Sequence, residues 1–547
     1  MKTLLLAVVV LAGLSACTVA PEGGGPQVSA ADTAQMAQVI ADRHLRRHLS
    51  SVPRTLDPTL STDVQGQQLF DDLFEGLVHV NNKGEIVPGV ARSWDVSPDG
   101  MLWTFHLDPK ACWSNGDALT ARDFVFSWRR LADPATASQA AEQLTPILNA
   151  DAVIAHKLPT DQLGVRAVDD LTLEVRLVAP TPYFLYLLTT NYLLPTPQSV
   201  IARHGSTWVE PGKIISNGPF VLEEMRINGA FQLRRNARYR EADQVQLERV
   251  TWYPVPEEAA STARFLAGDL DVTDRFGAVD LPWLRKQLGS QVLLAPYYGT
   301  VALGFHVQRK PFSSRALRLA LDMAADRELL TGKLLYGIYL PAYTLVPPSA
   351  GYTPALPEWA SWPAERRHAR ARELYAEAGY SKAHPLVVDL AFPASSVEQR
   401  RIFEALTAMW RVNLGAEVRL YSDEWKVHQN NRRLGTYDLF WDAWIGDYLD
   451  PLTFLQLWQK ASGNNYTRFT DPKFEALIAS AVATGDPAER LRLYHEAEAI
   501  AEDAVPNVPL YYYQSRHLVK PYVQGWSSNL VDRNPSRYLR LAAPPGG

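Results

Sequence analysis

The chain has 547 residues, of which 47% are hydrophobic and 21% are charged, and its formal net charge is −5. This balance is typical of a globular protein with an ample core, and the length favours more than one domain. No basic block interleaved with aromatic residues stands out, so composition and charge argue against a nucleic-acid partner.

The N-terminal segment is predicted to direct export. Lys2 is followed by an apolar run from Leu4 to Leu14, which is too short to span a bilayer that needs about 20 helical residues. We therefore interpret residues 1–16 as a cleaved signal peptide. The ending "LSAC" is similar to a bacterial lipobox, in which Cys17 would become the lipid-bearing first residue; an ordinary signal peptide with a chance cysteine is the alternative.

Residues 17–29 are predicted to form a flexible tether, because they are rich in Gly, Pro and Ala without a periodic apolar pattern. No other segment is long and apolar enough to cross a membrane. We thus expect a soluble body held by a lipid anchor on the periplasmic or cell-surface face of a bacterial envelope. If Cys17 carries lipid, Cys112 has no intramolecular partner, and stability must come from the core.

Strands and helices are predicted to alternate irregularly along the chain. Residues 102–109 and 171–180 alternate apolar and polar side chains, which is typical of strands. Thr120 followed by Asp123 resembles a capping box and predicts a helix over 121–131.

Two further helices are predicted in the second half of the chain. Residues 313–330 carry Leu317, Leu321 and Ala324 at helical spacing. Asp486, followed by a proline and then a glutamate three residues after the cap, begins a helix that continues to residue 503. These elements indicate a mixed α/β protein.

Motifs for catalysis are missing from the sequence. It contains no His-Glu-x-x-His, no Gly-x-Ser-x-Gly, no Cys-x-x-Cys and no phosphate-cradling glycine loop. His44 and His48 could bind a metal from one helix face; the alternative is a pair of exposed polar residues where the first strand begins. We favour exposed polar residues and predict no metal, no cofactor and no enzymatic activity. An exported hydrolase is kept as an alternative to the binding functions considered below.

The stretch "FWDAWIGDYLDP" places Asp442, Asp447 and Asp450 inside an aromatic run. Aromatic side chains favour burial, and a buried carboxylate is costly unless a cation or several donors meet it. The carboxylates could serve as turn caps, as structural ion-pair partners, as members of a solvated loop, or as the receptor of a cationic ligand.

A family resemblance covers essentially the whole mature chain. Residues 73–134 resemble the oligopeptide-binding proteins of peptide ABC transporters, which are solute-binding proteins of family 5. The resemblance continues in order through "SNGPF" at 216–220, "LAGDLDVT" at 266–273, "EWKVH" at 424–428 and "VPLYYYQSRHLVKPYV" at 508–523.

The resemblance implies a three-domain, two-lobed α/β fold of the periplasmic binding protein type, cluster C, which closes on its ligand as a monomer. Crossover segments near Tyr298 and Tyr513 would form the hinge. The implied partners are a peptide ligand and the membrane permease and ATPase components of an ABC importer. The implied boundaries are 30–74, 199–298 and 515–547 for domain I, 75–198 for domain II and 299–514 for domain III.

The resemblance also implies a ligand site. The motif "WIGDY" matches the family's amino-binding stretch, so Asp447 would receive the ligand's α-amino group. The peptide would add as a strand between Ala443–Ile445 and residues 63–65, which include Val64. Other implied ligand contacts, for whose aromatic members plain core packing is the alternative, are Trp425, Trp444, Asn464, Tyr513 and Arg275.

Departures from the family concern the carboxyl end of the ligand. The arginine that meets the carboxylate of short peptides in the best-known members is replaced by Trp441, and a histidine with a similar task falls near Glu398. A lysine position falls near Arg309, which keeps the charge, and a disulfide pair is replaced by Gly299 and Ile445. Either the ligand is a longer peptide that uses Arg309, or it differs, for example a cell-wall or modified peptide acting in recycling or signalling.

Overall fold

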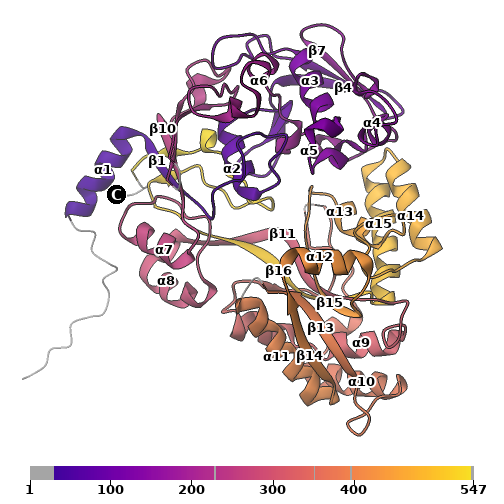
Figure 1. Cartoon of the computed structure of the whole chain (residues 1–547). Coiled ribbons are helices and arrows are strands. Elements are labelled where there is room, and N and C mark those ends of the chain that lie inside the picture. The colour runs from indigo at the N-terminus through magenta and orange to yellow at the C-terminus, as the bar shows by residue number, and fades with distance from the viewer. Residues whose placement is uncertain (1–29, 227–228, 350, 395–396, 544–547) are drawn as a thin grey trace, which may run out of the picture.

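Three larger sheets organise the fold (Figure 1). The computed structural model describes residues 30–226, 229–349, 351–394 and 397–543, so the predicted signal peptide, tether and lipidated Cys17 lie outside the described residues. None of the helices within these ranges is long and apolar enough to cross a membrane, and no cluster of potential metal ligands occurs in them.

The upper part of the molecule in Figure 1 contains two four-stranded sheets with orders β1-β10-β9-β8 and β4-β5-β7-β6. In the first sheet, β1 runs parallel to β10, although more than 200 residues separate them. The strands of these sheets are β1 (His44–Leu49), β4 (Ala91–Val96), β5 (Leu102–Leu107), β6 (Val165–Ala167), β7 (Thr172–Arg176), β8 (Phe220–Met225), β9 (Phe231–Arg235) and β10 (Arg249–Pro254), and β2 (Val78–Val80) and β3 (Ile86–Pro88) form a separate two-stranded sheet. The helices of this stretch of the chain are α1 (Ala30–Asp42), α2 (Val64–Leu73), α3 (Ala121–Ala132), α4 (Ala150–Ile154), α5 (Phe184–Leu187), α6 (Gln198–His204), α7 (Glu258–Leu266) and α8 (Leu281–Leu288); α7 and α8 lie below the upper sheets in Figure 1.

The lower part contains a six-stranded sheet with the order β12-β16-β11-β15-β13-β14. Its strands are β11 (Val292–Phe305), β12 (Leu340–Pro341), β13 (Val387–Pro393), β14 (Glu417–Asp423), β15 (Leu439–Ile445) and β16 (Asn507–Leu518); a short pair, β17 (Val523–Gln524) and β18 (Arg540–Leu541), follows. The helices are α9 (Arg315–Met323), α10 (Ala364–Glu377), α11 (Val397–Leu414), α12 (Trp425–Leu434), α13 (Leu452–Leu455), α14 (Pro472–Ala483) and α15 (Pro487–Ala504). Buried apolar side chains form two clusters, one centred on the upper sheets and one on this sheet.

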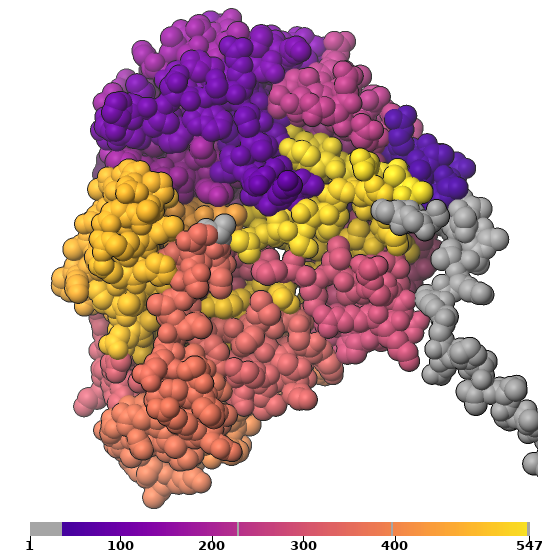
Figure 2. All heavy atoms as spheres, turned by 180° about the vertical axis from the view of Figure 1, so that it is seen from behind, coloured from indigo at the N-terminus to yellow at the C-terminus, as the bar shows by residue number. Residues whose placement is uncertain are grey.

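Two long strands, β11 and β16, connect the upper and lower parts (Figure 1). They pair from Val292↔Leu518 to Pro296↔Gln514 and resume at Thr300↔Tyr512, with an irregularity between. In the view from behind, the yellow C-terminal segment lies between the indigo and magenta upper part and the red to orange lower part (Figure 2). A second register shift lies between Val301 and Ala302, and such irregularities allow a strand to bend locally.

Several predicted elements are confirmed, with shifted ends. The strand predicted at 102–109 is β5, whereas the one predicted at 171–180 is limited to β7. The Thr120 N–H donates to the Asp123 carboxylate at 2.8 Å at the start of α3. The Asp486 carboxylate accepts from the Ala488 N–H at 2.9 Å at the start of α15.

The helix predicted over 313–330 ends early, at Met323. Arg327 is fully buried and donates to the carbonyl oxygens of Asp322 at 3.0 Å and Ala325 at 3.2 Å. The Asp322 carbonyl also accepts from the Ala325 N–H at 3.3 Å, so the arginine adds to the donors that satisfy the carbonyls at this helix end and stabilises the termination. The spacing of apolar residues carried no sign of this long-range cap.

The expectation that both early histidines are exposed is wrong for His48. Both lie on β1, and His48 is buried, with Nε2 2.8 Å from the Val255 carbonyl oxygen. Its Nδ1 accepts from the Asp274 N–H at 3.0 Å. The ring therefore joins β1 to two other segments, which explains why a polar residue lies inside.

Candidate functional site

Strand β15 has one open edge. It pairs with β11 from Gly299↔Ile445 to Phe305↔Leu439, whereas β13 pairs with it only at Leu439 and Phe440. From Trp441 to Ile445, no strand of the described chain lies on the β13 side. The extended conformation predicted at Ala443–Ile445 is thus confirmed, and its free backbone groups can pair with an extended chain.

Residues 63–65, beside which the ligand was expected to add as a strand, form the start of a helix. Asp63 caps α2, and its carboxylate accepts from the Gly66 N–H at 2.6 Å, so Val64 is the first helical residue. An aspartate at this position favours helix initiation because it satisfies an otherwise free N–H group. Val64, which is exposed, therefore lies at a helix start and offers no strand edge.

Two of the three carboxylates in "FWDAWIGDYLDP" have partners within the protein. Asp442 forms an ion pair with Arg432 at 2.8 Å. Asp450 accepts from the Leu452 N–H at 3.0 Å and lies 3.7 Å from the guanidinium of Arg490. Both are therefore structural carboxylates.

The third carboxylate, Asp447, forms no ion pair with any described residue. Its backbone N–H donates to Thr453 Oγ1 at 3.0 Å, which fixes the chain just beyond β15. The side chain is exposed to solvent, yet the surrounding protein removes enough water to raise the pKa of this carboxyl to about 6. A carboxylate that is partly desolvated and lacks a cation attracts an external one.

Residues of the upper part face Asp447. Burial, followed by the negative charges of Asp447 and Asp63, raises the pKa of Tyr192. Next to this point, the ring of Tyr448 stacks on Tyr183 with centroids 4.1 Å apart. Two carboxylates from distant parts of the chain thus make this end of the site electronegative.

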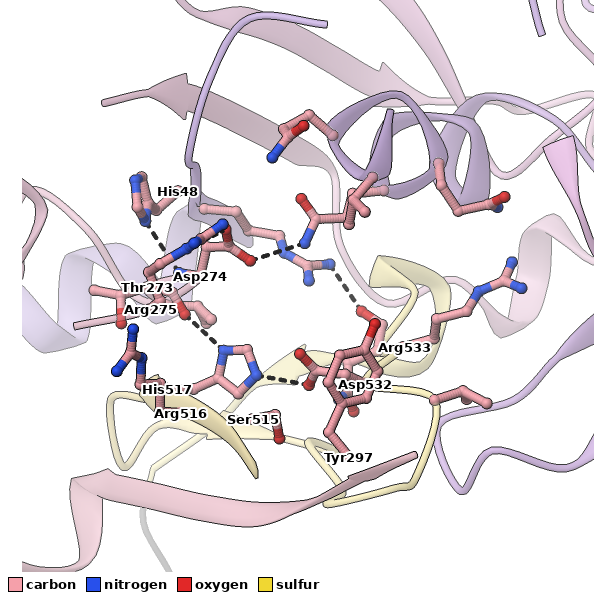
Figure 3. Close-up of a pocket in the computed structure, with 18 of the residues that line it drawn as sticks. His48, Thr273, Asp274, Arg275, Tyr297, Ser515, Arg516, His517, Asp532 and Arg533 are labelled. Carbon is pink, nitrogen blue, oxygen red and sulfur yellow. Dashed lines mark hydrogen bonds and ion pairs between the residues drawn. The ribbon is translucent and has the colours of Figure 1, made fainter. Parts of the chain in front are cut away.

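A cavity of about 480 Å³ lies beside the interruption of β11 and β16, and we call it the hinge cavity (Figure 3). Four predicted site residues line it: Val64, Arg275, Ile445 and Tyr513. Figure 3 shows that several charged side chains lie around it, including Asp274, Arg516, His517, Asp532 and Arg533. The pKa of the buried His517 is raised by the adjacent Asp532 in spite of the opposing effect of burial, and the two side chains lie 2.7 Å apart.

A second cavity of about 520 Å³ lies beside the open edge of β15, and we call it the tryptophan cavity. Four other predicted residues line it: Trp425, Ala443, Trp444 and Asn464. Trp425 and Trp441 meet edge to face with centroids 5.9 Å apart. Trp425 is 45% exposed, so plain core packing does not account for it.

Arg309 is not grouped with the other predicted residues. It forms an ion pair with Asp438 at 2.9 Å and donates to the Tyr437 carbonyl oxygen at 2.9 Å. Asp438 precedes β15, whereas Asp447 follows it, so about 20 Å of strand separates the two ends at about 3.3 Å per residue. Only an extended peptide of roughly six residues would reach from Asp447 to Arg309.

Several lining residues were not predicted from the sequence. Arg432 and Arg433 lie on α12 at the tryptophan cavity, and Tyr297 and Arg516 lie at the hinge cavity. The arginine pair in "NNRRLG" begins four residues after the matched "EWKVH" stretch and could have been found there. Arg516 lies within the matched "YYYQSRH" stretch, where nothing local distinguishes it from a core strand residue.

Comparisons with known proteins agree with this geometry. Residues 85–466 match the model of the bacterial extracellular solute-binding proteins, family 5 Middle. The periplasmic murein peptide-binding protein MppA of Escherichia coli (strain K12) is 38% identical over 495 residues, covering 90% of this chain and 92% of the relative.

Two solved structures are similar over nearly their whole length. The unliganded open form of the periplasmic murein tripeptide-binding protein MppA has a TM-score of 0.81 and 37% identity, covering 91% of this chain and 97% of that one. Haemophilus influenzae OppA, in complex with the peptide RPPGFSPFR, has a TM-score of 0.76 and 33% identity, covering 91% and 99%. The chain therefore belongs to the bacterial extracellular solute-binding proteins of family 5.

Proposed function

We propose that this protein captures peptides in extended form between its two lobes and delivers them to an ABC permease for import. The observation that carries the proposal is Asp447, a carboxylate that has no cationic partner among the described residues and lies at the end of the open edge of β15. A peptide's α-amino group would supply the missing cation, and its backbone would pair with Ala443–Ile445.

We assign the lobes by the boundaries given above. Domain I comprises residues 30–74, 199–298 and 515–547, domain II comprises 75–198, and domain III comprises 299–514. The interrupted pairing between Pro296 and Thr300 supports a hinge near Tyr298 and Tyr513, and hinge bending would close the cleft. Cys17 would carry the lipid anchor that holds a monomeric receptor near its permease.

The side chains around the open edge receive separate roles. Trp425, Trp444 and Asn464 would accommodate one ligand side chain in the tryptophan cavity, and Arg275 and Tyr513 another in the hinge cavity. Arg309, at the far end of β15, would serve only the carboxylate of a longer peptide. We infer a binding role without catalysis.

A second candidate ligand is a cell-wall peptide, bound for recycling or signalling. The relative MppA is named a murein peptide-binding protein, and Trp441 occupies the position where an arginine would meet a short peptide's carboxylate. Trp441 is 7% exposed and its Nε1 has no hydrogen-bond partner among the described residues, so it offers a donor but no charge.

Mass spectrometry of material released by denaturing the purified protein tests both candidates. Free-amino peptides of several residues are expected for the first, and peptides that contain D-residues or γ-linkages for the second. The same protein is then incubated with a defined peptide mixture. Recovery of hydrolysed peptides, or failure of every peptide to bind in calorimetry, would refute the proposal.

A further inference from the structure

The hinge cavity contains buried guanidinium N–H groups that have no acceptor. Arg47 Nε and Arg516 Nη1 are both buried, and neither has a hydrogen-bond partner among the described residues. Arg47 is 6% exposed and lies 4.1 Å from the ring centroid of Trp252. Its Nη1 donates to the Asn534 carbonyl oxygen at 2.8 Å, so only part of the guanidinium is satisfied.

The carboxylates around the cavity are already engaged. Asp71 is paired with Arg533, and Asp532 with His517. Asp274 accepts from Gln68 Nε2 at 3.0 Å. Gln68 Oε1 is the only buried side-chain acceptor of the cavity's described lining that lacks a partner. The cavity therefore presents chiefly unsatisfied cationic donors, which a carboxylate satisfies best.

A third guanidinium lies where it can move into the cavity. The side chain of Arg275 is 46% exposed, and its Nε forms a long ion pair with Asp274 at 3.7 Å, which is beyond hydrogen-bond distance. Its Nη2 donates to Ser50 Oγ at 3.2 Å. Figure 3 shows Arg275 and Arg516 on the same side of the cavity. Arg516 is anchored by Glu258 at 3.3 Å, which leaves its Nη1 free.

We propose that the hinge cavity is a subsite for an acidic side chain of the bound peptide, held between Arg275 and Arg516 with Arg47 beneath it. Ile445 lines this cavity and precedes Asp447 by two residues, so the acidic residue is close to the amino terminus of the ligand. This inference rests on the proposed peptide-binding function. Peptide binding through backbone pairing alone would not require it, since those contacts are independent of side chains.

Calorimetry with matched tripeptides tests the subsite. Trialanine is compared with peptides in which glutamate or glutamine replaces each alanine in turn, because the two side chains differ mainly in charge. At one position, glutamate is expected to bind at least tenfold more tightly than glutamine. Arg275→Gln and Arg516→Gln should each reduce that ratio to below twofold.

The control variant is Arg285→Gln, which removes the same charge from an exposed position on α8 outside the cavity; it should keep the full ratio. If Arg516→Gln fails to fold, Arg275→Gln still tests the subsite, because the side chain of Arg275 is 46% exposed whereas that of Arg516 is 13% exposed. If trialanine binds and no position distinguishes glutamate from glutamine, or if both variants keep the ratio, the subsite is refuted while the peptide-binding function stands. If no peptide binds, both fail.

Discussion

Replacing Asp447 by asparagine removes the carboxylate while keeping the size of the side chain. In the ligand-free protein this carboxylate has no cation among the described residues, so its main ion pair would be formed with the ligand. Closure of the lobes would remove water from that pair, and an ammonium group without a counter-ion would then be buried at a cost. The substitution should therefore weaken binding specifically for peptides with a free amino terminus.

The size of the effect follows from the geometry of such a pair. Two unit charges about 4 Å apart attract each other by about 4 kcal/mol at an effective dielectric constant of about 20. Breaking a buried pair costs about 3–5 kcal/mol, but the amide oxygen of asparagine keeps one hydrogen bond of about 1 kcal/mol. A loss of about 3 kcal/mol remains, which corresponds to roughly a hundredfold in affinity.

Isothermal titration calorimetry measures this with one peptide in free-amino and N-acetylated forms. The wild type should prefer the free-amino form strongly, and Asp447→Asn should largely abolish the preference. Asp442→Asn is a control, because that carboxylate is paired with Arg432 and should change both forms equally. Equal affinity of Asp447→Asn and the wild type for the free-amino peptide would show that Asp447 is structural.

Five further predictions concern Asp447, its neighbour Gly446, the closure of the lobes and Cys17. Because the pKa of Asp447 is about 6 in the free protein and ammonium binding needs the ionised form, affinity for free-amino peptides should be about tenfold lower at pH 5 than above pH 7, and a flat calorimetric profile would contradict this. The pKa of Asp447 is higher in the folded than in the unfolded protein, so its ionisation lowers the stability of the ligand-free protein, and fully so above pH 6. Thermal scans should therefore show a higher Tm for Asp447→Asn than for the wild type at pH 7.5. At pH 3.5, where the carboxyl is mostly protonated in both states, the two should barely differ. At Gly446 a Cβ would lie 2.6 Å from Tyr298 Cδ1, so Gly446→Ala should displace Asp447 and weaken binding in calorimetry, whereas Gly463→Ala, with nothing within 4 Å, should not. Bound peptide should reduce the radius of gyration measured by small-angle scattering, and unchanged curves would count against closure of the lobes. Cys17→Ser should release the protein from membranes, and wild-type protein that takes up no labelled fatty acid would count against the lipid anchor.

The parts of the fold that could be predicted are those encoded by neighbouring residues. The caps at Thr120 and Asp486 were found because donor and acceptor lie within three residues of each other. The end of α9 was missed because its carbonyls are satisfied by Arg327, which also donates to the distant Pro509 carbonyl oxygen. The burial of His48 likewise depends on Val255 and Asp274, which no local pattern connects to it.

In the candidate site, too, contacts between distant residues could not be predicted from the sequence. The motif around Asp447 was found through a family resemblance, whereas composition alone left three equivalent aspartates. Only the structure separates them, since the cations that neutralise Asp442 and Asp450 come from α12 and α15. The helix start at Val64 was not predicted, because the capping role of Asp63 was overlooked.

The open edge of β15 and the two cavities contribute differently to ligand choice. Hydrogen bonds between the edge and a peptide backbone are nearly the same for every peptide, so they cancel when two peptides compete. Selection must then come from groups that distinguish side chains or ends: Asp447 at the amino end, the guanidinium groups of the hinge cavity and the aromatic walls of the tryptophan cavity. A peptide pool bound at limiting protein should therefore keep varied sequences overall, while becoming enriched in acidic residues next to a free amino terminus. Sequencing of the bound pool measures this directly, and enrichment at neither feature would mean that the cavities only accommodate side chains without selecting them.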